Sequence, residues 1–162
     1  MKLSLVIPVY NEESNLENLY QRITNVLDGI GKPYEILLTN DGSQDNSTAV
    51  LNALYQRRPN QIRVIHFNGN YGQHMAIMAG LERVRGEVII TMDADLQHPP
   101  TLIPELIRHW EDGAEVVYTV RKKNEGASLF KKLTSHLYYW IFNRVAEVQT
   151  EPRSTDFRLM DR

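Results

Sequence analysis

Short apolar runs alternate along the chain with longer segments whose apolar residues recur at helical spacing. The short runs predict five buried strands, and the longer segments predict four helices. The predicted strands are 3–8, 34–38, 62–67, 88–90 and 115–120. The predicted helices are about 11–28, 45–57, 73–84 and 100–110. Strands that alternate with helices indicate the α/β class, with a mainly parallel, Rossmann-like sheet covered by helices on both faces.

Proline and glycine mark several of the predicted element ends. We expect Pro8 to end the first strand, because proline cannot donate a hydrogen bond to a sheet. Gly29 and Gly31 are expected to end the first helix, and Gly86 the third. Pro100 fits the first turn of the fourth helix, where its missing N–H is harmless. The third helix is rich in small residues, so we expect it to pack close to the sheet.

Composition narrows the picture further. The chain has 162 residues, of which 42% are hydrophobic, and this suits one globular domain with a sizeable core. There are no cysteines, so disulfides and thiolate zinc sites are excluded. No apolar run approaches the 18 residues or so that a bilayer-spanning helix needs, and residues 1–10 lack the pattern of a secretory signal.

The net charge of −2 gives no sign of nucleic-acid binding, but it is unevenly distributed. Residues 1–112 hold 9 Lys and Arg against 14 Asp and Glu, whereas residues 113–162 hold 9 against 6. The basic part could face phosphates or an anionic membrane surface, although a solvated face is the commoner explanation.

An acidic pair follows the fourth predicted strand, at Asp93 and Asp95. If the extended geometry of the strand persists through them, both carboxylates point to one side. Two such carboxylates suit a hard cation, Mg²⁺ or Mn²⁺, which is usually held by one or two carboxylates together with substrate phosphates. The pair therefore predicts a diphosphate site, and the alternative is a polar loop whose aspartates cap the next helix.

Polar clusters also follow the first two strands, and the carboxyl ends of parallel strands meet at one rim of a sheet, where ligands bind. Glu12 could line that rim or serve as a carboxylate at a helix N-terminus, and both roles are compatible. Asp41 could bind a ligand or belong to an ordinary Asp-Gly turn. Tyr10 could stack on a ring or fill the loop.

Four segments together resemble the family 2 inverting glycosyltransferases with the GT-A fold, in the same order along the chain. They are Ile7-Pro8-Val9-Tyr10-Asn11-Glu12-Glu13, Asn40-Asp41-Gly42-Ser43, Asn70-Tyr71-Gly72-Gln73-His74 and Met92-Asp93-Ala94-Asp95-Leu96-Gln97-His98-Pro99-Pro100. Within that family the chain is most similar to polyprenyl-phosphate sugar transferases, such as dolichyl-phosphate mannose synthases and bactoprenol glucosyltransferases. The resemblance implies a single GT-A catalytic domain over 1–162, with the C-terminal part and any membrane anchor absent.

The resemblance also implies roles for particular residues. On the donor side, the residues implied to hold the nucleoside are Pro8, Tyr10, Glu12 and Asp41, with Asp93 lining the nucleotide-sugar site. Asp95 and Gln97, beside Asp93, are implied to hold Mg²⁺ or Mn²⁺ with the diphosphate, and His98 is not a ligand by this analogy. Arg121 is expected to meet a phosphate, and Asp156 belongs to the D-F-R segment near the acceptor, a segment that favours the glucosyl- and mannosyl-transferring relatives.

The basic, aromatic segment at about 127–148 has two interpretations. Lysines mixed with aromatics are typical of an interfacial helix, and in the look-alike family this region leads toward the membrane. We therefore expect the full-length protein at the cytoplasmic face of a membrane. The alternative is a core helix that packs the same aromatics on the sheet.

The implied function is transfer of a sugar from a UDP- or GDP-sugar donor to a polyprenyl phosphate, with inversion. The nearest alternative is a family 2 enzyme that acts on a sugar hydroxyl in polysaccharide synthesis. A non-catalytic nucleotide-binding module is a third possibility. A dinucleotide-dependent oxidoreductase is disfavoured, because the turn after the first strand lacks the G-x-G-x-x-G pattern.

Overall fold

The computed structural model describes residues 2–120 and 154–162. In chain order the elements are β1 (Leu3–Val9), α1 (Glu13–Ile30), β2 (Tyr34–Asn40), α2 (Ser47–Arg57), β3 (Ile62–His66), α3 (Gln73–Leu81), β4 (Val88–Thr91), a 3₁₀ turn (Pro100–Leu102), α4 (Ile103–Glu111), β5 (Val116–Val120) and β6 (Ser154–Asp161). The five predicted strands and four predicted helices are therefore confirmed, with ends that move by a few residues. Strand β6 was not predicted from the sequence.

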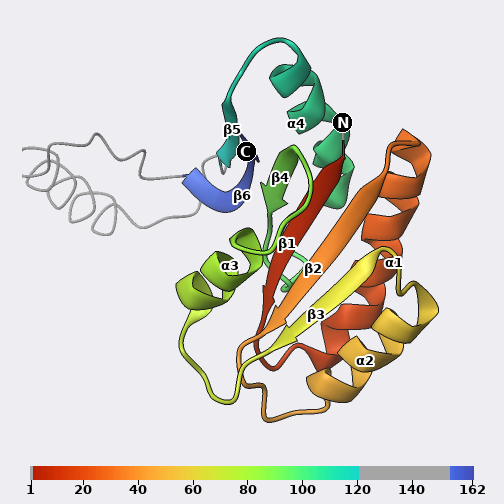
Figure 1. Cartoon of the computed structure of the whole chain (residues 1–162), viewed down its shortest axis with the longest axis vertical. Coiled ribbons are helices and arrows are strands. Elements are labelled where there is room, and N and C mark those ends of the chain that lie inside the picture. The colour runs from red at the N-terminus through yellow and green to blue at the C-terminus, as the bar shows by residue number, and fades with distance from the viewer. Residues whose placement is uncertain (1, 121–153) are drawn as a thin grey trace, which may run out of the picture. The chain divides into compact units, whose positions relative to one another are not determined.

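The strands form one six-stranded sheet in the order β3-β2-β1-β4-β6-β5 (Figure 1). The pairs β1–β2, β1–β4 and β2–β3 are parallel, while β4 and β6 are antiparallel. Every residue of β1, β2 and β4 is buried, as expected for parallel strands that are covered on both faces. The predicted mainly parallel α/β architecture is confirmed.

Helices cover both faces of this sheet. Alternate residues of β1, such as Leu5 and Ile7, join the main core with buried residues of α1, α2 and α4. The intervening residue Val6 faces the other way, in a smaller cluster with Leu37 and Ile89. Helix α3 lies on that second face (Figure 1), and its Gly80 approaches so closely that an added Cβ would lie 2.4 Å from Val6 Cγ1. The small residues of α3 therefore permit the close packing that the sequence predicts.

Two predicted element ends are wrong. Strand β1 continues through Pro8 to Val9. Pro8 is tolerated because β4 pairs only with residues 3–6 of β1, and the N–H that Pro8 lacks would face the side where this pairing has stopped. Helix α3 ends at Leu81 rather than at Gly86. Gly86 instead passes close to the start of β1, where an added Cβ would lie 2.6 Å from the carbonyl oxygen of Lys2.

The chain divides into two compact units, Met1–Tyr118 together with Asp156–Arg162, and Thr119–Thr155. All of the site described below belongs to the first unit. In the second unit, the hydroxyls of Thr119 and Thr155 lie 2.6 Å apart. Among the described residues, no helix has both the length and the apolar character needed to cross a bilayer.

Candidate active site at the carboxyl ends of the strands

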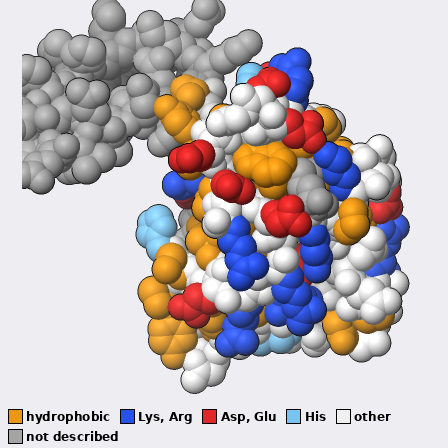
Figure 2. Space-filling view, turned by 45° about the horizontal axis from the view of Figure 1, so that its top comes forward, with side chains coloured by type: hydrophobic (Ala, Val, Ile, Leu, Met, Phe, Trp, Pro, Cys, Tyr) orange, Lys and Arg blue, Asp and Glu red, His pale blue; other side chains and the backbone are white. Residues whose placement is uncertain are grey.

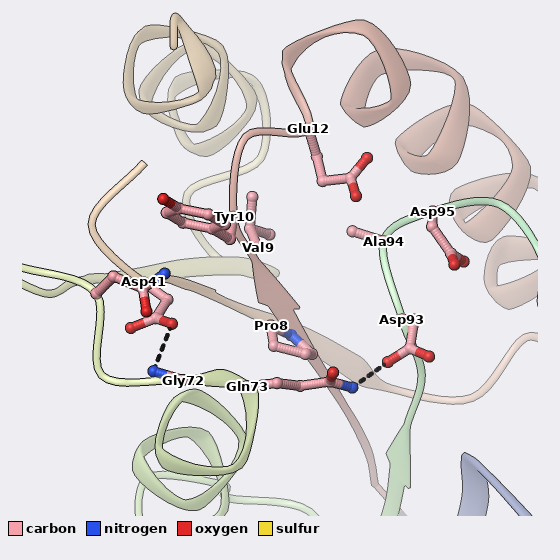
Figure 3. A pocket seen from close by; sticks show the side chains of 11 residues that line it. Pro8, Val9, Tyr10, Glu12, Asp41, Gly72, Gln73, Asp93, Ala94 and Asp95 are labelled. Atoms are coloured by element: carbon pink, nitrogen blue, oxygen red, sulfur yellow. Dashed lines mark hydrogen bonds between the residues drawn. The ribbon is translucent and has the colours of Figure 1, made fainter. Parts of the chain in front are cut away.

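An open pocket of about 300 Å³ lies where β1, β2 and β4 end. Its charged lining residues are all acidic, and they come from the loops that follow these three strands (Figure 3). The lining residues are Pro8, Val9, Tyr10, Glu12, Asp41, Asn70, Gly72, Gln73, Asp93, Ala94 and Asp95. The parallel register of the strands explains this gathering, because it brings their carboxyl ends to one rim of the sheet.

The loops after β1 and β2 are tied together by hydrogen bonds between backbone and side chains. Asn11 adopts a left-handed conformation with φ of 55°, and its Oδ1 accepts the N–H of Gln44 at 2.8 Å. In return, the N–H groups of Asn11 and Glu12 donate to the hydroxyls of Ser43 and Ser47, each at 3.0 Å. This mutual bracing fixes the loop that carries Tyr10 and Glu12.

The two side chains on this loop take different positions. Tyr10 lines the pocket and is 42% exposed, so it does not fill the loop. Glu12 occupies the N-cap position of α1, and its carboxylate accepts a hydrogen bond from the Asn15 amide at 2.6 Å rather than from a backbone N–H. Glu12 therefore combines a place at a helix start with a place on the pocket wall.

Asp41 is buried at the end of β2 and holds the loop that precedes α3. Its carboxylate accepts the backbone N–H of Tyr71 at 2.7 Å. It also accepts the backbone N–H of Gly72 at 2.9 Å, as Figure 3 shows. The following Gly42 is required, because φ is 67° and an added Cβ would lie 2.4 Å from the backbone of Gly69. Asp41 therefore belongs both to an Asp-Gly turn and to the pocket, because the turn directs its side chain toward the loop that forms the opposite wall.

Asp93 and Asp95 both line the pocket, but they do not reach it through the extended strand geometry that the sequence suggested. Strand β4 ends at Thr91, so extended geometry does not persist through the pair and that expectation is wrong. Instead the chain turns: Asp95 Oδ1 accepts the N–H of Gln97 at 3.0 Å, and Leu96 has a φ of 63°. Such a turn with a left-handed leucine is sterically costly and persists only where its surroundings enforce it.

The buried side chain of His98 supplies part of that enforcement. Its Nδ1 accepts the backbone N–H of Asp93 at 3.3 Å, and its ring stacks on Phe157 of β6 with centroids 5.4 Å apart. Because Nδ1 accepts, the ring proton belongs on Nε2, which has no hydrogen-bond partner among the described residues. His98 thereby connects strand β6 to the loop that carries Asp93 and Asp95, which we call the acidic loop.

Asp156 on β6 lies beside Asp93, although the two are far apart in sequence. The amide nitrogen of Gln73 donates to Asp93 Oδ1 at 2.7 Å and to Asp156 Oδ2 at 3.2 Å. The other oxygen of Asp156 pairs with Arg158 at 2.5 Å, and its carbonyl oxygen accepts from the Thr91 hydroxyl. Asp156 is therefore held from three sides.

Most of the residues singled out by the sequence are brought together. Those that line the pocket are Pro8, Tyr10, Glu12, Asp41, Asp93 and Asp95. Gln97 is exposed and lies outside the lining, and Asp156 reaches the lining through Gln73. Arg121 and the segment 127–148 lie outside the described residues. Two further lining residues, Asn70 and Gln73, were not predicted individually, although both belong to the Asn70-Tyr71-Gly72-Gln73-His74 segment that resembles the family.

The acidic lining has the donor chemistry of a hard-cation site. Within the described ranges, no group of three or more His, Asp or Glu side chains is arranged to enclose a metal ion. Asp93 and Asp95 supply carboxylate oxygens on one open wall, and Mg²⁺ or Mn²⁺ bound by few protein ligands is completed by water and phosphate oxygens. The residues present therefore fit a cation that arrives with a diphosphate.

A mainly parallel sheet with an acidic pocket at the carboxyl ends of its strands defines an α/β protein whose ligand site lies at the usual rim of such sheets. The family model described as "Glycosyl transferase family 2" matches residues 4–161, so the chain belongs to this family. The chain is 41% identical over all 162 residues to the uncharacterized glycosyltransferases sll0501 of Synechocystis sp. and YkcC of Bacillus subtilis. It spans about half the length of these curated relatives, 51% and 50%.

Solved structures share the fold. Glucosyl-3-phosphoglycerate synthase from Mycobacterium tuberculosis, in complex with Mn²⁺, UDP and glucosyl-3-phosphoglycerate, matches 99% of this chain with a TM-score of 0.66 and 18% identity, over 56% of its own chain. A mannosyltransferase from Pyrobaculum calidifontis, in complex with GDP-Man and Mn²⁺, matches 74% of this chain with a TM-score of 0.58 and 19% identity, over 35% of its own. The predicted GT-A fold is confirmed.

Proposed function

We propose that this chain forms the donor-binding part of an inverting glycosyltransferase that moves a sugar from a UDP- or GDP-sugar to a polyprenyl phosphate. The observation that carries the proposal is the pocket at which carboxylates from three strand ends converge. Family membership supports the reaction class. Structures of the same fold that hold UDP or GDP-Man with Mn²⁺ support a nucleotide-sugar donor.

The proposed donor site has two ends. Tyr10, Glu12 and Asp41, together with Pro8, would hold the nucleoside in the part of the pocket between the loops after β1 and β2. Asp93, Asp95 and Gln97 would hold Mg²⁺ or Mn²⁺ at the diphosphate. The bound cation would offset the negative charge that grows on the departing nucleoside diphosphate.

In the proposed reaction, an oxygen of the acceptor phosphate forms a bond to the anomeric carbon from the side opposite the diphosphate. The bond from that carbon to the diphosphate oxygen breaks, its electron pair leaves with the nucleoside diphosphate, and the configuration inverts. A phosphate monoester has a second pKa of about 6, so it is already largely ionised at neutral pH and needs no strong base. Arg121 would meet one of the phosphates.

The surroundings of Asp156 support a phosphate acceptor over a sugar hydroxyl. A hydroxyl acceptor needs a carboxylate that takes up its proton. Both oxygens of Asp156 accept N–H groups, from Gln73 and from Arg158, and these two contacts fix the orientation of the carboxylate. Asp156 is thus better suited to positioning than to proton transfer. The lipid nature of the acceptor, and a place at the cytoplasmic face of a membrane, belong to the same proposal.

Calorimetry with UDP and with GDP, each with and without Mn²⁺, tests the donor site. We expect binding that Mn²⁺ tightens, and we expect Asp95→Asn to remove most of this tightening with a small effect on melting temperature, because Asp95 lies on the pocket wall. Equal affinity with and without Mn²⁺ would remove the cation from the proposal. A large loss of melting temperature with metal-dependent binding retained would make Asp95 a structural residue.

A further inference from the structure

Gln73 belongs neither to the acidic loop nor to the D-F-R segment, but its side chain contacts both. It is the first residue of α3, it is exposed, and its side chain crosses the pocket wall toward β4 (Figure 3). One amide nitrogen contacts two carboxylates, that of Asp93 after β4 at 2.7 Å and that of Asp156 on the neighbouring strand β6 at 3.2 Å. Both oxygens therefore lie within about 6 Å of each other, a separation at which two carboxylates repel.

An amide is well matched to this arrangement. The NH₂ group of glutamine carries two donors, so it offers one N–H to each carboxylate and lowers their repulsion without a positive charge. A lysine at the same place would neutralise the carboxylates and compete directly with a divalent cation. Glutamine adds no positive charge, so a divalent cation at Asp93 would meet no competing cation from this side chain.

The backbone before Gln73 is itself fixed by the pocket. Gly72, with a φ of 95°, donates its N–H to the buried carboxylate of Asp41 at 2.9 Å. The connection therefore runs from Asp41 at the end of β2, through Gly72 and Gln73, to Asp93 after β4 and Asp156 on β6. A short series of hydrogen bonds links the nucleoside end of the pocket to the segment implied to lie near the acceptor.

The geometry points to Gln73 as a positioning residue that orients Asp93 for the cation and holds Asp156 beside it. One side chain thereby fixes the relative positions of the donor and acceptor sides of the site. This inference rests on the proposed function. Residues that hydrogen-bond a metal-binding carboxylate typically contribute about 10–100-fold to metal affinity. A merely structural role would instead appear in the stability of the fold.

The test compares Gln73→Met with Gln56→Met in the whole 162-residue chain. Methionine keeps the length of the side chain and removes the donors, and Gln56 is an exposed residue of α2 away from the pocket. We expect both variants to melt alike. For Gln73→Met alone, we expect the affinity for UDP or GDP with Mn²⁺ to fall by about tenfold or more, with less than about a twofold change when Mn²⁺ is left out.

Metal-dependent binding by Gln73→Met that equals that of the unaltered chain overturns the inference and leaves the proposed function standing. An unaltered chain that binds neither nucleotide in a metal-dependent way overturns the proposed function, and this inference with it. A second arm adds Asp156→Asn to each background. If Gln73 connects the two carboxylates, this change has a smaller effect on metal-dependent binding in Gln73→Met than in the unaltered chain, whereas equal effects contradict the connection.

Discussion

His98 contributes both to the packing of the fold and to the geometry of the pocket. Its ring stacks on Phe157, and its Nδ1 accepts the N–H of Asp93. Two substitutions separate these contacts. His98→Phe keeps an aromatic ring on Phe157 and removes the acceptor, together with the Nε2 that has no partner in the part of the chain that the structure describes. His98→Asn places a carbonyl oxygen near the position of Nδ1 and removes the stack.

We expect His98→Phe to change the free energy of unfolding by less than about 1.5 kcal/mol, because the volume change is small and no polar group of the ring is left buried. We expect this variant to lose about tenfold in Mn²⁺-dependent UDP affinity, since the acidic loop loses an anchor. His98→Asn should show the opposite pattern, with about 2–4 kcal/mol of lost stability from the missing ring. Urea unfolding and calorimetry measure both quantities, and equal UDP affinity in the two variants would contradict the assignment.

At the scale of elements, Glu35 ties together the beginnings of three strands. This side chain of β2 is 2% exposed and accepts the hydroxyl of Ser4 on β1 at 2.6 Å. It also accepts a guanidinium N–H of Arg63 on β3 at 3.1 Å and the backbone N–H of Arg85 at 2.6 Å. Figure 2 brings forward the end of the molecule where β1 begins, and Lys and Arg side chains gather there among Asp and Glu.

These contacts give Glu35 a pH-dependent contribution to stability. Burial by itself would raise the pKa of its carboxyl, but the hydrogen bonds from Ser4, Arg85 and Arg63 outweigh it, and the pKa lies below its ordinary value of 4.5. A carboxyl whose pKa is lower in the folded state stabilises the fold above the unfolded pKa. This contribution is lost as the pH falls from about 4.5 through the folded pKa.

We therefore expect Glu35→Gln to lower the free energy of unfolding by about 1.5–3 kcal/mol at pH 7, the range for hydrogen bonds to a charged group. The difference from the unaltered chain should shrink as the pH falls from about 4.5 through the lowered pKa of the folded state. Urea unfolding at pH 7 and at a pH below that folded pKa measures it. Glu82→Gln, at an exposed position, should stay within about 0.5 kcal/mol at both. A loss for Glu35→Gln that does not depend on pH would be incompatible with this account.

The same scale shows which elements a sequence pattern can predict. Strands β1, β2 and β4 follow from their apolar runs, because burial on both faces of a parallel sheet demands such runs. Strand β6 was missed although Phe157 and Leu159 alternate there with polar residues. Its strand character depends on pairing with β4, which lies more than 60 residues earlier in the chain. The prediction that Pro8 ends the first strand was wrong for a related reason, because the length of the neighbouring strand decides whether a proline is tolerated.

For the whole molecule, the pocket was predictable to the extent that it follows from topology. Parallel strands place Glu12, Asp41 and the acidic pair on one rim, and the sequence shows that these residues follow strands. The position of Gln73 could not be predicted in this way. Its contact with Asp156 joins residues 83 apart, on a helix and an antiparallel strand whose proximity only the folded structure reveals.

The uneven charge of the chain carries a prediction about membranes. The acidic residues that line the pocket come from residues 1–112, whereas residues 113–162 hold more Lys and Arg than Asp and Glu. Within the latter part, the segment 129–144 combines cations with aromatic side chains and lies outside the described residues. Its cations are Lys131, Lys132 and Arg144, and its aromatics include Tyr138, Trp140 and Phe142. We propose that this segment meets an anionic lipid surface near the polyprenyl phosphate.

Each cation close to such a surface would contribute about 1 kcal/mol, and the attraction would fall off within a Debye length of about 10 Å at 0.1 M salt. We therefore expect weak sedimentation with anionic vesicles at low salt, little at high salt and little with neutral vesicles. The double variant Lys131→Glu and Lys132→Glu should lose this binding while keeping its affinity for UDP with Mn²⁺. If the aromatics instead pack in the protein core, the chain will not sediment with anionic vesicles even at low salt. That result would end the membrane proposal and leave the nucleotide-sugar site intact, because the site depends on carboxylates at the strand ends and not on this segment.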